Sequence, residues 1–100
     1  MIRNSPSDPT LLVLSSLAGG YKHGYAMMDD IECMADVRLG PGTLYGAITR
    51  LEERGLIRPV ESDDRRQPYA ITGAGRAFLA EQLALLDRLV RTGQKRLKRI

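Results

Sequence analysis

The residues with the clearest chemical potential lie in the segment 40–57, which reads GPGTLYGAITRLEERGLI. Hydroxyl and guanidinium groups in this segment can donate hydrogen bonds to phosphate oxygens or to base edges, and two glycines leave the backbone open to close approach. The candidate DNA-contact residues are Gly42, Thr43, Tyr45, Gly46, Thr49 and Arg50. The alternative interpretation of the same pattern is an ordinary amphipathic surface helix.

The same segment predicts a helix over residues 41–54. Pro41 suits the first helical position, and Gly55 suits the end because glycine readily adopts the left-handed conformation. An apolar stripe on one side consists of Leu44, Ile48 and Leu51, spaced i, i+4 and i+7. We therefore expect a helix with a packed back and a small, polar, basic front.

A second basic feature follows at residues 62–68. The segments 57–62 and 68–71 read as two strands, and the polar turn 63–67 lies between them. Arg65 and Arg66 at this turn could enter the minor groove or bind the DNA backbone. Asp63 and Asp64 beside them could hold the arginines by ion pairing. The alternative is a solvated turn of mixed charge.

Lys22 and His23 form part of a short link, residues 21–23, before a predicted helix over 24–35. They could contact a DNA phosphate near the amino end of that helix, where free N–H groups attract anions. The alternative for His23 is a packing or helix-capping role. A metal site is not predicted, because the chain has no second ligand at a useful spacing.

Other chemistry finds little support in the sequence. Asp29, Asp30 and Glu32 fall on the outer side of the helix over 24–35, where solvation is expected rather than catalysis. Cys33 has no neighbouring His or basic residue, so a buried packing role is predicted. With no nucleophile–base pair, metal set or phosphate loop, we predict neither an enzyme nor a cofactor.

The remaining segments must position these candidates. Residues 1–9 read as a flexible arm, and a mostly apolar helix is predicted from Ser7 or Asp8 through Ala18 at the centre of the core. Residues 37–39 alternate and could form one short strand. The predicted buried stripe of the helix over 24–35 consists of Gly24, Met27, Met28, Ile31 and Met34.

A long last helix is predicted from Gly73 to Leu97, with Thr72 as its cap. Its apolar seam has one gap, at Gly93, and is wider than one small domain easily covers. The candidate dimerisation residues are Phe78, Leu79, Leu83, Leu86, Leu89, Val90 and Leu97. The seam could instead fold back on its own domain. The basic tail that follows is expected to keep the helix end soluble, with DNA contact as the alternative.

Composition sets broad limits. The chain has 100 residues, a formal net charge of +3 and one cysteine. These values predict a single domain, allow a nucleic-acid partner and fit a reducing cytoplasm. Neither a signal peptide nor an apolar run long enough to span a bilayer is recognised, so no membrane association is predicted.

The predicted order is three helices and then a hairpin, which is the winged helix-turn-helix arrangement: a mainly α fold with a small β-hairpin. We divide the chain into an N-terminal arm (1–9), a winged-helix DNA-binding domain (10–71), and a C-terminal dimerisation helix with a basic tail (72–100). Helix 41–54 would lie in the major groove and the wing at 62–68 on the backbone or minor groove.

Several short segments in order resemble the PadR family of bacterial transcriptional regulators, over about residues 10–90. They are HGY at 23–25, PGTLY at 41–45, LEERGLI at 51–57, RR at 65–66 ahead of Tyr69, and ITGAGR at 71–76. The resemblance implies a dimeric regulator, usually a repressor, whose C-terminal helix forms the dimer interface; this chain is similar to the short form with a single such helix. It also implies a small-molecule or other effector, which the sequence does not identify.

Three departures from that family pattern stand out. Gly40 replaces the Ser or Thr that often precedes the Pro-Gly-Thr run, and Gly46 replaces a frequent proline. The chain has no tryptophan, so the stacked drug pocket of some members is not carried over.

From the predicted arrangement and the family resemblance together, we expect a homodimeric regulator, most simply a repressor, on a palindromic operator. The alternative is a winged-helix protein-interaction module that does not bind DNA.

Overall fold

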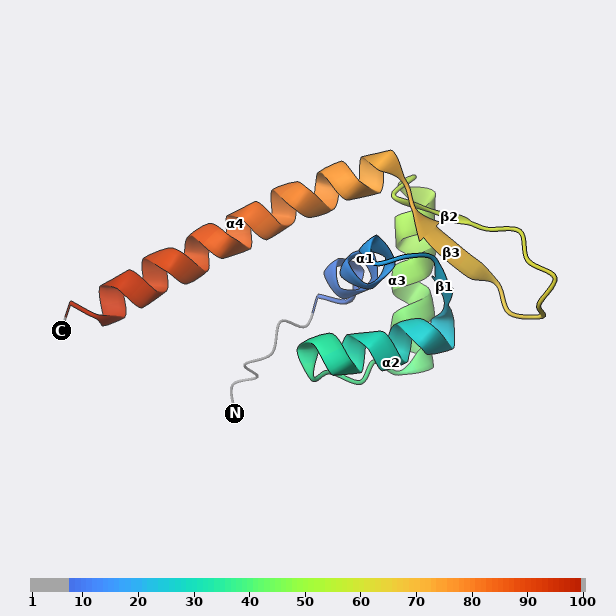
Figure 1. Cartoon of the computed structure of the whole chain (residues 1–100), viewed down its shortest axis with the longest axis horizontal. Coiled ribbons are helices and arrows are strands. Elements are labelled where there is room, and N and C mark those ends of the chain that lie inside the picture. The colour runs from blue at the N-terminus through green and yellow to red at the C-terminus, as the bar shows by residue number, and fades with distance from the viewer. Residues whose placement is uncertain (1–7, 100) are drawn as a thin grey trace.

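The computed structural model describes residues 8–99. The order of elements is α1 (Pro9–Ala18), β1 (Lys22–His23), α2 (Gly24–Ala35), α3 (Pro41–Glu53), β2 (Ile57–Pro59), β3 (Pro68–Ile71) and α4 (Gly73–Leu97). Figure 1 shows α1, α2, α3 and the small sheet grouped together, while α4 and the β2–β3 loop project in opposite directions. The molecule is longest along the direction of these projections, with extents of 57 × 30 × 20 Å.

Helix α1 occupies the centre of the helical group. It contacts α2, α3, α4 and β3, which is why its sequence is apolar on most sides. Asp8 caps its first turn, because the Asp8 carboxylate accepts a hydrogen bond from the backbone N of Thr10 at 3.0 Å. The predicted central helix is thus confirmed, and the predicted arm lies outside the described residues except for Asp8 and Pro9, which begin α1.

One hydrophobic core joins the three helices, the sheet and the start of α4. Its most buried side chains come from the predicted stripes of α1, α2 and α3. The core comprises Leu12, Val13, Leu14, Leu17, Met27, Met28, Ile31, Leu39, Leu44, Ala47, Ile48, Leu51, Leu56, Ile57 and Leu79.

Helix α3 has the start and the stop expected from its sequence. Gly40 makes no side-chain capping bond, and Pro41 opens the first turn. At the other end Gly55 adopts a left-handed φ of 73°, and the N–H of Leu56 donates to the carbonyl of Leu51 at 3.0 Å. This is a Schellman motif, which turns the chain directly into β2.

The sheet has three antiparallel strands in the order β1-β3-β2. The hairpin of β2 and β3 is confirmed, but the predicted link at 21–23 contains a strand, since Lys22 pairs with Tyr69 and His23 with Pro68. A strand of two residues is too short to show alternation in the sequence. The predicted strand over 57–62 is also too long, because β2 ends at Pro59.

The predicted strand at 37–39 is wrong. These residues form an irregular connection in which Val37 is half-buried and Leu39 is buried. Between them Arg38 points outward and pairs with Asp29 and Glu32 of α2, at 2.7 and 3.1 Å. The alternation therefore reflects packing against the core and an ion pair on the surface, without strand pairing.

Two predictions about α2 are also wrong. Met34 is 45% exposed, because the core covers the apolar stripe only as far as Ile31. Cys33 is exposed rather than buried, since it lies on the side of α2 opposite the core.

Helix α4 begins packed and then leaves the domain. Thr72 caps it by accepting a hydrogen bond from the backbone N of Gly75 at 3.0 Å, and Leu79 is buried in the domain core. Beyond Leu79 the large apolar side chains of α4 are 40–70% exposed; they are Leu83, Leu85, Leu86, Leu89, Val90 and Leu97. Within residues 8–99 no helix has the length and apolar character needed to cross a membrane.

Candidate nucleic-acid interface

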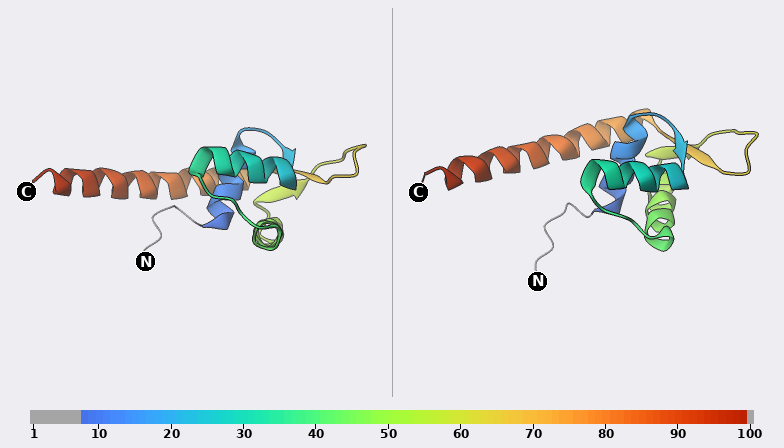
Figure 2. Two further views of the ribbon diagram at one scale, coloured as in Figure 1. Left: turned by 90° about the horizontal axis from the view of Figure 1, so that it is seen from below. Right: turned by 60° about the horizontal axis from the view of Figure 1, so that its bottom comes forward.

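The polar side of α3 is open to solvent. Leu44, Ala47, Ile48 and Leu51 are buried on its other side, which confirms the two-sided helix predicted from the spacing. In Figure 2 α3 lies at the edge of the helical group, so one of its sides is uncovered. On that side Gly42, Thr43, Tyr45, Thr49 and Arg50 are exposed and Gly46 is half-exposed.

The exposed groups of α3 differ in what they can offer a ligand. The Thr49 hydroxyl donates to the carbonyl of Tyr45 at 2.9 Å, so its proton is used within the helix. The Arg50 guanidinium lies over Gly46, where its Nη1 atom is 3.4 Å from the position that a Cβ atom of residue 46 would occupy. Arg50 therefore supplies the cationic donors of this face, and its guanidinium has no ion-pair partner within residues 8–99.

Tyr45 reaches from α3 to the start of α2. A Cβ atom at residue 24 would lie 2.3 Å from the Tyr45 hydroxyl oxygen, a distance that only glycine permits. Gly24 is buried, as its place in the predicted stripe of α2 requires, but the contact with Tyr45 is not predicted from the sequence. Nothing in the spacing of the chain could have shown it, since the contact joins residues 21 positions apart.

His23 connects α2 to the loop between β2 and β3. Its Nδ1 atom accepts from the backbone N of Ala26 at 3.3 Å, so His23 caps α2. Its Nε2 atom lies 3.2 Å from Nη1 of Arg66. A hollow of about 240 Å³ opens beside this contact; its lining residues are His23, Gly24, Tyr25, Tyr45, Arg65, Arg66 and Gln67. The structure thus brings together candidate residues from α2, α3 and the wing.

Lys22 does not join this group. Its ammonium donates to the carbonyls of Ser16 and Gly20 and lies 3.9 Å from the Asp30 carboxylate. The buried Ser16 hydroxyl also donates to Asp30, at 2.7 Å. Asp30 was predicted to face solvent with its acidic neighbours, but it is half-buried because it serves this contact between α1 and α2. Lys22 therefore holds β1 against the helices.

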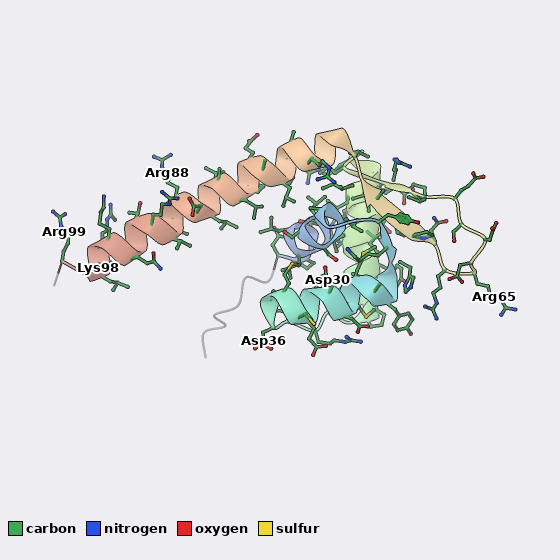
Figure 3. The ribbon with its side chains drawn as sticks, viewed as in Figure 1. Asp30, Asp36, Arg65, Arg88, Lys98 and Arg99 are labelled. Carbon is green, nitrogen blue, oxygen red and sulfur yellow. The ribbon has the colours of Figure 1, made fainter. Side chains whose placement is uncertain are left out.

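The wing loop presents its arginines without acidic partners on their guanidinium groups. In residues 8–99 the ion pairs are Lys22–Asp30, Arg38 with Asp29 and Glu32, and Arg91–Asp87. The predicted pairing of Asp63 and Asp64 with the wing arginines is therefore wrong; Asp64 instead accepts from the backbone N–H of Arg66 at 3.4 Å. Figure 3 shows Arg65 at the far end of the loop, pointing into solvent.

Gln67 is a wing residue outside the predicted set of DNA contacts. Its side-chain amide donates to the carbonyls of Val60 at 2.9 Å and Pro68 at 2.8 Å. These bonds close the base of the loop, where the chain returns to β3. Gln67 therefore fixes the base from which Arg65 and Arg66 extend.

Two side chains, Arg38 and Tyr69, have pKa values above their ordinary range. Hydrogen bonding to Asp29, with a smaller contribution from Glu32, raises the pKa of Arg38, whose guanidinium is paired with these two carboxylates of α2. Burial raises the pKa of Tyr69 on β3, and the negative charge of Glu52 and the nearby Tyr45 add to the effect. Within residues 8–99 no group of three His, Cys, Asp or Glu side chains could hold a metal ion.

The whole unit described above, from α1 to the first turns of α4, has a counterpart in known proteins. Residues 13–81 match the model of the transcriptional regulator PadR-like family. The chain belongs to the PadR-like family. PadR family members are DNA-binding regulators rather than enzymes, so the resemblance in the sequence and the prediction that the chain is not an enzyme are both confirmed.

Two relatives illustrate the range of PadR-like chains. A transcriptional regulator of Mycobacterium tuberculosis is 34% identical over 84 residues, which cover 81% of this chain and 78% of that protein. A 37.1 kDa protein of a Streptomyces fradiae transposon is 46% identical over 83 residues, or 83% of this chain. The matched part spans only 24% of the transposon protein's length.

Solved structures agree with the PadR-like assignment. A transcriptional regulator from Clostridium thermocellum is 27% identical with a TM-score of 0.77, covering 87% of each chain. A PadR family regulator from Eggerthella lenta is 28% identical with a TM-score of 0.77, covering 91% of this chain and 82% of its own. A PadR family regulator from Clostridium difficile has a TM-score of 0.80 at 23% identity, over 89% and 97% of the chains, and supports the fold alone. The predicted winged-helix fold is confirmed.

Proposed function

We propose that this PadR-like regulator binds double-stranded DNA with α3 in the major groove and the wing, residues 62–68, on the backbone or in the minor groove. The observation that carries the proposal is the uncovered polar side of α3 beside a loop whose two arginines have no acidic partner among the described residues. Gly42, Thr43, Tyr45, Gly46, Thr49 and Arg50 form the major-groove face, and His23, Arg65 and Arg66 form the flank.

The regulator acts as a homodimer in this proposal. The exposed apolar half of α4 supports it, because burying each large apolar side chain contributes about 1.5–3 kcal/mol. Leu83, Leu86, Leu89, Val90 and Leu97 make the proposed seam, while Phe78 and Leu79 pack within their own domain. A two-fold dimer places two α3 helices on one side of the molecule, so the operator is palindromic.

The regulatory outcome in this proposal is repression. A dimer that covers an operator competes with the transcription machinery for the same DNA, and an unidentified small-molecule effector that changes the relative position of the two α3 helices would release it. A cytoplasmic location follows from the proposed target, since the regulator must reach the DNA.

Selection of bound sequences from a random duplex pool tests the proposal. We expect enrichment of an inverted repeat, with an affinity that falls steeply with salt as phosphate contacts are lost. Binding that does not fall with salt would contradict the electrostatic basis of the proposal. Failure to enrich any sequence, together with no shift of the protein's own promoter region, would favour the protein-interaction module.

A further inference from the structure

His23 lies between two hydrogen-bond donors. Its Nδ1 atom is 3.3 Å from the backbone N of Ala26, and its Nε2 atom is 3.2 Å from Nη1 of Arg66. A neutral imidazole carries one N–H and one acceptor nitrogen, and a protonated imidazole carries no acceptor at all. His23 therefore cannot accept a hydrogen bond from both neighbours at the same time.

The helix cap decides which nitrogen carries the proton. As the N-cap of α2, His23 accepts at Nδ1 and satisfies one of the free N–H groups of the first turn. The proton is then on Nε2, which faces the Arg66 guanidinium. The Nε2 atom of His23 and the Nη1 atom of Arg66 are then two donors 3.2 Å apart, and a single oxygen atom that accepts from both would satisfy them together.

The hollow beside this pair suits an anionic oxygen. Its volume is about 240 Å³, and none of its lining residues is acidic. Arg65 lines the hollow from the wing while its side chain extends into solvent, and the Tyr45 hydroxyl lies against Gly24 at the same hollow. The cap uses one of the free N–H groups at the start of α2, and the side chains of His23, Arg66 and Tyr45 supply the donors that define the site.

We propose that His23 and Arg66 bind the same phosphodiester group of the DNA backbone, with Nε2–H and the guanidinium as paired donors and the Tyr45 hydroxyl as a third. This His23–Arg66 clamp rests on the proposed function and adds to it the pairing of two residues on one phosphate. The clamp joins the wing to the first turn of α2, so DNA itself fixes where the wing lies relative to α3.

A double-mutant cycle tests the clamp. His23→Asn keeps an oxygen that caps α2 and removes the Nε2–H donor, while Arg66→Gln removes the guanidinium. Binding of a short random-sequence duplex is followed by fluorescence anisotropy over a range of salt concentrations. Each single variant should bind about tenfold more weakly, and the double variant no more weakly than Arg66→Gln alone. In Arg66→Gln the slope of log K against log salt should be smaller in magnitude than in the wild-type protein by about 0.9, the value for one phosphate contact.

Arg88→Gln is the matched control. Arg88 points away from the outer side of α4 in Figure 3, far from the wing, so the same loss of charge there should leave affinity and slope unchanged. Thermal melts of all variants show whether the fold is kept.

A second measurement does not depend on any variant. His23 is the chain's only histidine, so its imidazole nitrogens give a single pair of signals in NMR spectra. In the DNA complex we expect Nε2 protonated and Nδ1 unprotonated. The clamp would be overturned if the losses in the cycle were additive, or if Nδ1 were protonated in the complex. In either case, DNA binding by the wild-type protein would still support the proposed function. A wild-type protein that binds no DNA would overturn both.

Discussion

Single residues set the shape of the candidate interface through close contacts rather than through charge alone. Gly24 allows the Tyr45 ring to cross the start of α2, and His23 beside it fills two roles, as helix cap and as neighbour of Arg66. Charge counting would select Lys22 before His23, yet the Lys22 ammonium is occupied by backbone carbonyls. The cationic side chains that can contact DNA are those whose N–H donors face solvent.

Replacing Gly24 by alanine tests the close contact. The added Cβ atom would meet the Tyr45 hydroxyl at 2.3 Å and ring carbon Cζ at 2.8 Å, so the ring must move away. Because these atoms are the far end of a side chain, we expect a loss of stability below about 1.5 kcal/mol. Affinity for DNA should fall several-fold, as measured by anisotropy. An unchanged affinity would show that Tyr45 does not contribute to binding.

Arg50 is the residue of α3 best suited to read a base, because its guanidinium offers paired donors that match guanine. Arg50→Ala should weaken binding to the selected operator by about 1–3 kcal/mol. Competition assays on operator and random duplexes separate the two kinds of contact. An equal loss on both would place Arg50 on a phosphate instead of a base.

At the scale of elements, close backbone contacts hold the junction of α3, β2 and α4 together. The Thr72 hydroxyl donates to the carbonyl of Gly55 at 2.8 Å, and the backbone N–H of Thr72 donates to the carbonyl of Leu56 at 3.1 Å. Gly75 then lies directly against that same Leu56 carbonyl. The direction in which α4 leaves the domain is therefore fixed by the end of α3.

Gly75→Ala should disrupt this junction. A Cβ atom at residue 75 would lie 2.1 Å from the Leu56 carbonyl oxygen, which is backbone and cannot swing aside. We expect a loss of about 3 kcal/mol in the free energy of unfolding, at the upper end for overpacking. Gly73→Ala is the control, because a Cβ atom at residue 73 has no neighbour within 4 Å. Urea unfolding of both variants gives the comparison, and equal stability of the two would contradict the assigned contact.

The sequence predicts helices correctly where an apolar periodicity extends over several turns and a capping residue marks an end. The bounds of α2 and α4 and the two sides of α3 follow from apolar spacing together with Gly55 and Thr72. It was uninformative for β1, whose existence depends on pairing with residues 68 and 69, and for Asp30, whose burial depends on Ser16. Contacts between distant segments, such as Gly24 with Tyr45, leave no local pattern to read.

The same distinction applies to the site. The polar side of α3 could be selected by residue type and spacing, but the mutual placement of His23 and Arg66 could not. Those residues are 43 positions apart, and only the antiparallel pairing of β1 with β3 brings the wing back to the start of α2.

The whole molecule is a helical domain with a long extension. Most of α4 beyond Leu79 lies clear of the domain, and its apolar and basic side chains are both exposed. Figure 3 shows Arg88 and Arg99 directed away from α4 on its upper side. In the proposed dimer the apolar seam is covered while such cations stay in water.

Leu86→Asp tests this arrangement, because a carboxylate in an apolar seam is strongly unfavourable unless it is paired. We expect the wild-type protein to sediment as a dimer at micromolar concentration and the variant as a monomer with weaker binding to the inverted repeat. Ala84→Asp adds the same charge on the exposed side away from the seam and should remain dimeric. A monomeric wild-type protein would contradict the proposed homodimer.

The enclosure of Lys22 has a consequence for its chemical reactivity. Acylating reagents attack a free amine, and the Lys22 ammonium is held by two carbonyls and lies near Asp30, with only 21% of its side chain exposed. The other lysines of the chain, Lys95 and Lys98, are exposed near the end of α4. In the folded protein Lys22 should therefore be modified last. The extent of its modification, measured by mass spectrometry of the peptide that contains it, would report when α1 separates from α2. One reagent would then report the integrity of the helical domain separately from the accessibility of the α4 extension.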